Sequence, residues 1–397
     1  MRRITSALAA ALALALPPTF AAAVETRKDP VETSPVEAGL AAEVRGDFAG
    51  ALKLLREAAG RGDAAAQYQV GRFYNAGVGM PADPQTAATW YQKAVDQGDV
   101  SAKGDLGIMY VTGRGVPQNV VQGLSLLNAA ANAGAVVAQS NLCVLYFEGV
   151  GVKADLGQAL NWCRKAAPEG QAPAQFVLGD MYNYGLGGLP INHQLALAWC
   201  LAAASQGNAP AENCMGVMFA NGWDLPTDGA QAVAWFRKGV GQNDAGSQLS
   251  LGEAYSKGLG VEKDATQALF WSRKAADQGV LEAEKWLGRA YQTGFGAKVD
   301  LAEAFKWWRK AADRGDAVAQ GEVGLAYARG AGVRRDGVQA LMWIILADAH
   351  IPASAARFLD EAGARVRKRL SPADIAEAER LARIWRPECA ALQKCQA

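Results

Sequence analysis

Small and apolar residues recur along this chain at the spacing of helices that bury one face. In the stretch 247–279, Leu251 and Tyr255 stand four residues apart, and Ala268 and Trp271 stand three apart farther on. Residues three or four apart lie on the same side of a helix, so each run predicts an amphipathic helix. The stretch therefore predicts two successive helices, here called A and B.

Glycine and acidic residues mark where these helices end and begin. Gly258 and Gly260 follow helix A, and glycine readily adopts the left-handed conformation that closes a helix. Asp264 then stands where a carboxylate accepts the first free N–H groups of helix B, and Gly279 closes that helix. Equivalent capping residues are expected at Asp83, Asn119, Asp155, Asn192, Asp228, Asp300 and Asp336.

The two-helix unit repeats through most of the chain. One aromatic column steps by 36 residues, with a single step of 37: Tyr74, Tyr110, Tyr146, Tyr182, Phe219, Tyr255, Tyr291 and Tyr327. A second column keeps the same steps: Trp90, Leu126, Trp162, Trp199, Trp235, Trp271, Trp307 and Trp343. Each helix pair exposes an apolar face that only the next pair covers, so this period predicts a solenoid.

The motif L-G-x-x-Y, the loop G-x-G-V and the sequence W-x-x-K-A-A resemble the SEL-one-like repeat (SLR) family, a relative of tetratricopeptide repeats. The resemblance implies an all-α fold, a right-handed α-solenoid of antiparallel helix pairs. We expect eight repeats over residues 64–351, preceded by a partial repeat over 38–63. The pattern fades after Trp343, so residues 352–397 are expected to form a helical C-terminal cap and tail, with a last helix that starts at Ser371.

The N-terminal stretch has the features of a secretory signal peptide. Arg2 and Arg3 precede an apolar run that ends at Leu16, and an alanine-rich cleavage site follows. Residues 1–23 are therefore expected to be removed, and residues 24–37 to form a flexible leader. The mature protein is expected in the periplasm or the extracellular space.

Composition and charge narrow the class of partner. The chain is 50% hydrophobic and 20% charged, with a formal net charge of +1. A near-neutral chain gives no support for a nucleic-acid partner or an anionic membrane surface, and the basic run 365–369 is interpreted as a solvated helix face. No stretch after the signal peptide reaches the roughly 18 consecutive apolar residues of a membrane span, so none is expected in the mature chain.

Six cysteines in an exported chain predict disulfides, although six cysteines allow fifteen connectivities. Cys200 stands seven residues before Gly207 and Cys214 seven residues after it. In an antiparallel helix hairpin the two cysteines therefore lie at the same level along the helix axes. The analogous position of two cysteines within one repeat suggests a second bridge, and the last two cysteines would close a loop in the tail. The expected pairs are Cys143–Cys163, Cys200–Cys214 and Cys389–Cys395.

No arrangement of residues typical of catalysis or metal binding occurs in the sequence. The only two histidines, His193 and His350, fall in different repeats, which argues against a histidine-based metal site or a Ser-His-Asp triad. The motifs H-E-x-x-H, G-x-S-x-G and the Walker loop are missing. The recurring G-x-G follows a helix rather than a strand, so it is interpreted as a turn. We expect a non-enzymatic protein without a cofactor or a metal.

Helical geometry nominates a binding surface on the A helices. We number positions within helix A from the aromatic column, which is position 0. The aromatic residue and the leucine at position −4 mark the buried face, so positions −6, −5, −2 and +2 lie on the opposite side of the helix. These positions are apolar in the middle repeats and charged toward the ends, which suits an extended peptide or a partner's helix. The expected binding residues are Tyr68, Arg72, Ile108, Val144, Phe176, Asp180, Tyr184, Val217, Trp286 and Arg289. The alternative is that the packing of successive repeats buries these positions too.

The resemblance implies a protein–protein interaction scaffold. Bacterial SLR proteins act as adaptors in envelope signalling, exopolysaccharide assembly or host contact, and the partner would be another protein or an extended peptide. A cysteine-rich branch of the family implies an alternative role, the binding or hydrolysis of peptidoglycan-like or β-lactam substrates. In that branch paired cysteines recur in successive repeats at short spacing, and this chain lacks that pattern.

Overall fold

The computed structural model of the protein describes residues 34–350 and 353–387, and every structural statement below refers to them. This part of the chain contains twenty α-helices, one short 3-10 helix and no strand. The expected signal peptide, most of the expected leader, and the Cys389–Cys395 pair lie outside the described residues. Contacts divide the chain into two compact units, Met1–Ala198 and Trp199–Ala397, and the division falls within helix α11 (His193–Ser205).

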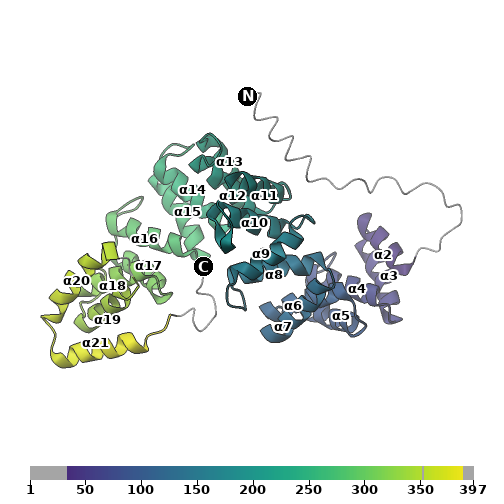
Figure 1. Cartoon of the computed structure of the whole chain (residues 1–397), viewed down its shortest axis with the longest axis horizontal. Coiled ribbons are helices and arrows are strands. Elements are labelled where there is room, and N and C mark those ends of the chain that lie inside the picture. Colours follow the sequence, from purple (N-terminus) through teal and green to yellow (C-terminus); the bar gives the residue numbers. More distant parts are fainter. Residues whose placement is uncertain (1–33, 351–352, 388–397) are drawn as a thin grey trace. The chain divides into compact units, whose positions relative to one another are not determined.

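Unit 1 is a succession of helix pairs in which each helix packs on the one before it and the one after it (Figure 1). Its helices are α2 (Pro35–Val44), α3 (Phe48–Gly60), α4 (Ala64–Ala76), α5 (Pro84–Asp96), α6 (Val100–Thr112), α7 (Val120–Asn132), α8 (Val136–Glu148), α9 (Leu156–Ala166) and α10 (Ala172–Tyr184), followed by the 3-10 helix η1 (Leu186–Gly188).

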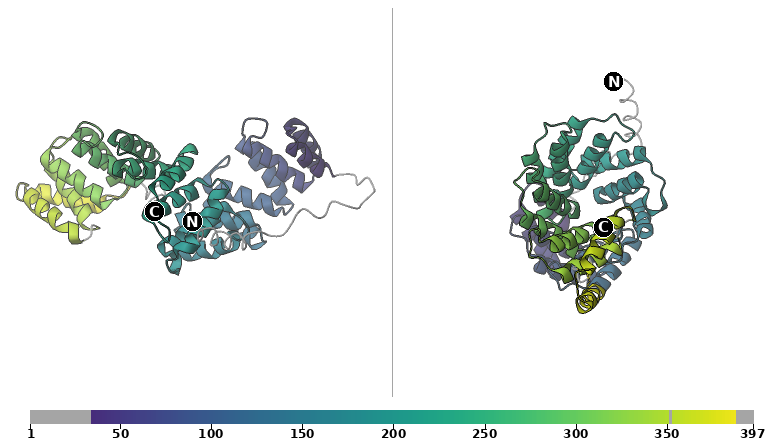
Figure 2. Two further views of the ribbon diagram at one scale, coloured as in Figure 1. Left: turned by 90° about the horizontal axis from the view of Figure 1, so that it is seen from above. Right: turned by 90° about the vertical axis from the view of Figure 1, so that its left-hand side faces the viewer.

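Unit 2 continues the same pattern and ends in two further helices that cover its last repeat (Figure 2). Its helices are α12 (Ala209–Asn221), α13 (Gly229–Gly241), α14 (Ala245–Lys257), α15 (Ala265–Asp277), α16 (Leu281–Thr293), α17 (Leu301–Asp313), α18 (Ala317–Arg329), α19 (Gly337–Asp348), α20 (Ala353–Arg367) and α21 (Pro372–Ile384). The predicted all-α repeat of paired helices is therefore confirmed.

The predicted capping residues and closing glycines explain where the helices begin and end. Asp264 accepts hydrogen bonds from the backbone N–H groups of Thr266 and Gln267 at the start of α15. The other seven predicted caps each accept from the third residue after them, which satisfies an N–H that the first helical turn leaves free. Each A helix from α4 to α18 ends at a glycine with positive φ, such as Gly258 at 74°.

A glycine three residues before the aromatic column allows helix A to approach helix B closely. A Cβ atom placed on Gly288 would lie 2.6 Å from the Trp308 ring, and one on Gly71 would lie 2.5 Å from the Tyr91 ring. Both distances are too short for non-bonded carbon atoms. The recurrent glycine thus makes room for an aromatic ring that fills the space between the two helices.

Buried polar side chains seven residues before the aromatic column bond the A helices to neighbouring B helices. The amide nitrogen of Gln67 donates to the carbonyl oxygen of Ala59, and Gln175 does the same to Ala167. In unit 2 this position holds Glu284, whose carboxylate is fully buried and pairs with Lys310 and Arg314 at 3.0 and 3.2 Å. The glutamine bonds satisfy carbonyl groups at the end of the preceding B helix, and the Glu284 ion pairs join α16 to α17 within one repeat.

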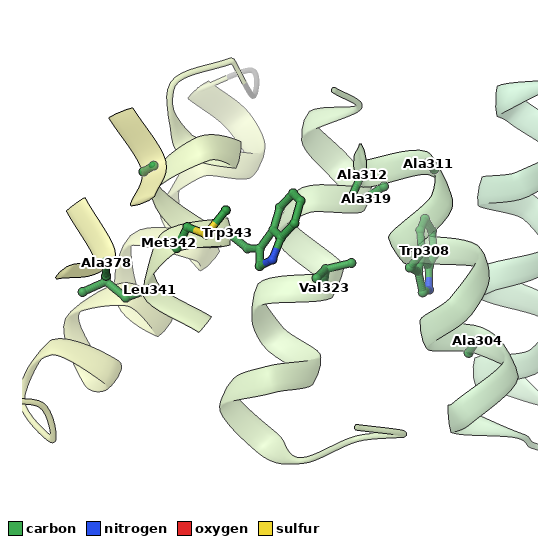
Figure 3. Packing of buried hydrophobic residues seen from close by; sticks show 11 residues of the cluster. Ala304, Trp308, Ala311, Ala312, Ala319, Val323, Leu341, Met342, Trp343 and Ala378 are labelled. Atoms are coloured by element: carbon green, nitrogen blue, oxygen red, sulfur yellow. The ribbon is translucent and has the colours of Figure 1, made fainter. Parts of the chain in front are cut away.

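The core of unit 2 runs without interruption into the C-terminal cap. Trp343 on α19 is fully buried, and Figure 3 shows it beside Met342 and opposite Val323 of α18. Ala378 on α21 belongs to the same cluster, because α21 packs directly on α19. Helix α21 begins directly after Ser371, the residue at which the sequence placed its start, and Ser371 caps the helix by accepting a hydrogen bond from the Asp374 N–H.

Helix α2 begins inside the segment that was expected to be a leader. Ser34 accepts a hydrogen bond from the Glu37 N–H, and the Glu37 carboxylate accepts one from the Ser34 N–H. This capping box starts the helix at Pro35. Gly39 and Ala42 are buried against α3, so the partial repeat is a full helix pair.

Candidate functional site

The ten predicted binding residues lie on A helices of both units. In unit 1 they are Tyr68 and Arg72 on α4, Ile108 on α6, Val144 on α8, and Phe176, Asp180 and Tyr184 on α10; in unit 2 they are Val217 on α12 and Trp286 and Arg289 on α16. Tyr184 and Arg289 are exposed, and the other eight are half-buried. All ten side chains therefore reach the surface at least in part, and most of them are less open than helical geometry alone implied.

Contacts between successive A helices explain the partial burial. Helix α6 packs on α8, and α8 packs on α10, so residues at equivalent repeat positions form a row along unit 1. The side chains of each helix are partly covered by those of the next. Leu325, at position −2 of α18, follows the alternative expectation that packing buries these positions. It is buried against Leu359 of cap helix α20.

The row in unit 1 includes three carboxylates, and we call it the unit 1 face. It consists of positions −6, −5, −2 and +2 of helices α4, α6, α8 and α10, and its acids are Asp105, Glu148 and Asp180. Asp105 and Glu148 occupy positions that the geometry nominated. Neither was among the expected binding residues, which were taken from position −2 and, at the other positions, from aromatic side chains.

Asp180 is one of two acids of the unit 1 face that have no cation beside them. It forms no ion pair and no hydrogen bond to another side chain within the described part of the chain. Burial raises its pKa from 3.8 to about 6, because the surrounding protein disfavours the charged form. Burial also raises the pKa of the neighbouring Tyr184, and the negative charge of Asp180 adds to that effect.

The other two acids are held in different surroundings. Glu148, the last residue of α8, is exposed, and the partial burial of its carboxyl group raises its pKa. The pKa of Asp105 is also raised by burial, and this is partly offset by the nearby hydroxyls of Tyr91 and Tyr68 and by the charge of Arg72. The pKa of Tyr68 is raised to about 12, mainly by burial and to a smaller extent by the negative charge of Asp105.

The one basic residue predicted in this row has an internal partner. An Arg72 guanidinium nitrogen lies 3.4 Å from a Glu43 carboxylate oxygen on α2. The unit 1 face therefore combines two acids without a cation, Glu148 and Asp180, with half-buried aromatic and aliphatic side chains. Such a surface is complementary to a segment that carries positive charge and apolar groups.

The predicted residues of unit 2 do not gather in the same way. Val217 packs against a buried cluster that contains Phe236 and Leu251. Trp286 packs edge-on against Phe295, with ring centroids 5.7 Å apart. These two side chains contribute to packing between helices, so unit 2 offers fewer of the expected contact residues.

The structure joins two cysteine pairs as the hairpin register predicted. Cys143 on α8 is bonded to Cys163 on α9, with Cα atoms 5.0 Å apart, and Cys200 on α11 to Cys214 on α12, with Cα atoms 6.3 Å apart. The side chain of Cys214 turns toward the preceding B helix although its position was nominated for the opposite side. The angular criterion was therefore too coarse at this position.

No group of side chains in the described ranges is arranged to hold a metal ion. The Nδ1 atom of His193 lies 3.0 Å from the Asn183 side-chain oxygen, and that of His350 lies 3.3 Å from the Leu346 carbonyl oxygen. Among the helices between residues 34 and 387 that the structure describes, none has the length and hydropathy that crossing a bilayer requires.

The helix pairs, with their capping residues and closing glycines, match one known family through most of the chain. The Sel1 repeat matches at residues 64–99, 101–134, 136–170, 172–208, 209–244, 245–280, 281–316 and 317–347. The chain belongs to the Sel1 repeat family. Sel1 repeat proteins generally serve as protein-interaction scaffolds rather than enzymes.

Solved structures of Sel1 repeat proteins resemble this chain over most of its length. A Sel1 repeat protein from Oxalobacter formigenes is 28% identical, with a TM-score of 0.51, and the match covers 88% of this chain and 98% of that chain. The protective antigen c5321 of uropathogenic Escherichia coli strains, which displays an SLR fold, is 28% identical with a TM-score of 0.47, over 91% of this chain and 86% of that chain. No match was found among curated proteins.

Proposed function

We propose that this protein is an exported Sel1 repeat adaptor whose unit 1 face binds a basic, partly apolar segment of a partner protein. The observation that carries the proposal is the unpaired carboxylate of Asp180 among half-buried apolar side chains. A buried charge without a partner destabilises a protein, so its presence on a surface row is best explained by a cation supplied from outside. Glu148 and Asp105 extend the same negative charge along the row.

Export is supported by the cross-links. Disulfides persist in oxidising compartments such as the periplasm and the extracellular space. The two bonded pairs tie neighbouring helices that already pack together, as expected of permanent structural bridges. An adaptor in envelope signalling or exopolysaccharide assembly fits this location, and the partner would be an envelope protein with an exposed basic segment.

A peptide titration tests the binding proposal. The probe is a short fluorescein-labelled peptide of alternating lysine and leucine, and the reference is the same peptide with glutamate in place of lysine. The wild-type protein should bind the lysine peptide saturably, with an affinity that falls as salt is added. The double variant Asp180→Asn, Glu148→Gln should bind it at least about tenfold more weakly, since each charged pair contributes about 1 kcal/mol or more.

A matched control separates the site from general charge. The variant Glu57→Gln, Glu169→Gln removes two exposed acids of unit 1 and should bind the lysine peptide as the wild type does. Equal binding of both peptides, or no effect of the Asp180 and Glu148 changes, would show that the unit 1 face is not the binding site.

The alternative role toward β-lactam substrates has its own measurement. Purified protein is incubated with a chromogenic β-lactam, and turnover is followed by absorbance. Activity that survives extensive purification would favour the hydrolytic role over the adaptor role.

A further inference from the structure

A second surface feature lies in unit 2, far along the chain from the unit 1 face. A pocket of about 660 Å³ opens between the end of α19, the helix α21 and the turn before α18. Pockets that accommodate ligands or anchoring side chains are typically about 300–1,000 Å³. Its size therefore suits one or two side chains of a bound segment.

The floor of the pocket is apolar and packs on the core of unit 2. It is formed by Ile345 and Leu346 of α19 and by Ala382 and Trp385 at the end of α21. The Trp385 ring packs edge-on against the buried Trp343, with centroids 5.7 Å apart. Trp343 sits in the closed core seen in Figure 3, so the floor has a fixed support behind it.

The rim of the pocket carries an excess of positive charge. Three arginines line it, Arg367, Arg383 and Arg386, against a single acid, Glu379. Arg367 is paired with Glu379 at 2.9 Å. Among the residues that the structure describes, neither Arg383 nor Arg386 has an acidic partner.

One of these arginines is held in place by the backbone. An Nη1 atom of Arg386 donates hydrogen bonds to the carbonyl oxygens of Arg383 and Trp385, at 2.9 and 2.6 Å. Fixing the guanidinium in advance lowers the entropy that binding must remove. The remaining N–H groups of Arg386 and those of Arg383 are available to carboxylate oxygens.

We propose that this pocket is a second protein-binding site, which takes an acidic segment of a partner with one apolar side chain at its centre. The apolar side chain would rest on Trp385 and Ile345, and flanking carboxylates would pair with Arg383 and Arg386. Arginine and tryptophan are the residue types that contribute most to protein interfaces. The rim has a net charge of +2 from its three arginines and one glutamate, so charge complementarity selects an acidic segment.

This inference goes beyond the proposed function, because it adds a site of opposite charge in the other unit and does not depend on the unit 1 face. A scaffold with an acidic site and a basic site can hold two different partners, or two segments of one partner. Each site can be removed without touching the other.

The test uses the full chain and a fluorescein-labelled peptide with a central leucine-phenylalanine pair flanked by glutamates. Fluorescence anisotropy measures binding to the wild type and to the variant Arg383→Gln, Arg386→Gln. Both arginines are exposed, so the variant should fold normally, and circular dichroism checks this. We expect saturable binding by the wild type and a loss of at least about tenfold in the variant.

Matched controls make the outcome decisive. The variant Arg329→Gln, Arg334→Gln removes the same charge from exposed positions of unit 2 outside the pocket, and it should bind as the wild type does. The variant Asp180→Asn, Glu148→Gln should also bind this peptide normally, whatever it does to the lysine peptide. No saturable binding by the wild type, or equal binding by the Arg383 and Arg386 variant, would overturn the proposal. If the protein instead self-associates through Arg383 and Arg386 and binds no peptide, the proposal is overturned, and the pocket binds a second copy of the chain.

Discussion

Replacing Asp180 by asparagine should stabilise the protein, although it removes a charged side chain from its surface. In the wild type the half-buried carboxylate lies on α10 without a cation, and burial raises its pKa from 3.8 to about 6. At neutral pH the folded chain must therefore hold a charge in surroundings that disfavour it. Asparagine has nearly the same shape and carries no charge, so this penalty disappears.

The size of the effect follows from the pKa shift. A shift of about two units corresponds to about 3 kcal/mol of free energy of unfolding, since each unit corresponds to about 1.4 kcal/mol. Solvent reaches part of the side chain and the asparagine amide also needs hydrogen bonds, so we expect about 2 kcal/mol.

The pH dependence has a definite sign. The folded-state pKa of Asp180 lies above the unfolded value, so the folded state binds the proton more tightly. The wild type therefore gains stability as pH falls from about 6 to about 4, where the carboxyl group becomes neutral. The advantage of the Asp180→Asn variant should be full at pH 7–8, decline between about pH 6 and 4, and vanish at lower pH.

Hydrogen exchange measures this locally, which matters because a chain of two units does not need to unfold in one step. At pH 8 the amide protons of α10 should exchange about thirtyfold more slowly in the variant, which corresponds to 2 kcal/mol. Amides of α14 in unit 2 serve as an internal reference, and Glu169→Gln, an exposed acid of unit 1, serves as a matched variant. A variant that exchanges faster at pH 8, or an advantage that stays constant from pH 8 to 4, would refute the reasoning about Asp180.

Two further expectations concern packing and cross-links. Gly288→Ala should lower the free energy of unfolding of unit 2 by about 1–3 kcal/mol, because its Cβ atom would press on the Trp308 ring. Gly241→Ala, at an open position at the end of α13, should change it by less than about 0.5 kcal/mol, and an equal loss in both variants by urea denaturation would contradict the close-approach argument. Cys143→Ser with Cys163→Ser should cost about 3 kcal/mol, the value expected for a bridge between residues 20 apart, and unfolding that is insensitive to reduction would show that the bridge contributes nothing.

Local features of the sequence were sufficient to predict the repeat and the two cysteine pairs that the structure describes. The caps such as Asp264 and the closing glycines such as Gly258 act on the helix that they adjoin, so their effect is visible in a short window. The register of a short hairpin follows from counting residues on either side of its turn. For this reason the Cys200–Cys214 pair could be predicted, even though the direction of the Cys214 side chain could not.

The burial and the charge surroundings of the candidate site depended more on tertiary structure than the helices and their ends did. Helical geometry indicated which side of each A helix faces away from its partner, and eight of the ten nominated residues proved half-buried rather than open. The geometry could not show that Leu325 is covered by α20, or that Asp180 stands without a cation. Both facts depend on helices that lie elsewhere in the chain.

Interactions between residues close together in the chain set the helix pair, its 36-residue period and its ends, and these features in turn mark the family. The burial of particular carboxylates and the position of a pocket depend on how helices from separate parts of the chain pack. The pocket beside Trp385 exists because α21 packs on α19 and leaves a gap beyond its last turn. Burial and cavities arise where separate helices meet, and the angle and depth of that packing are set by all the side chains between them.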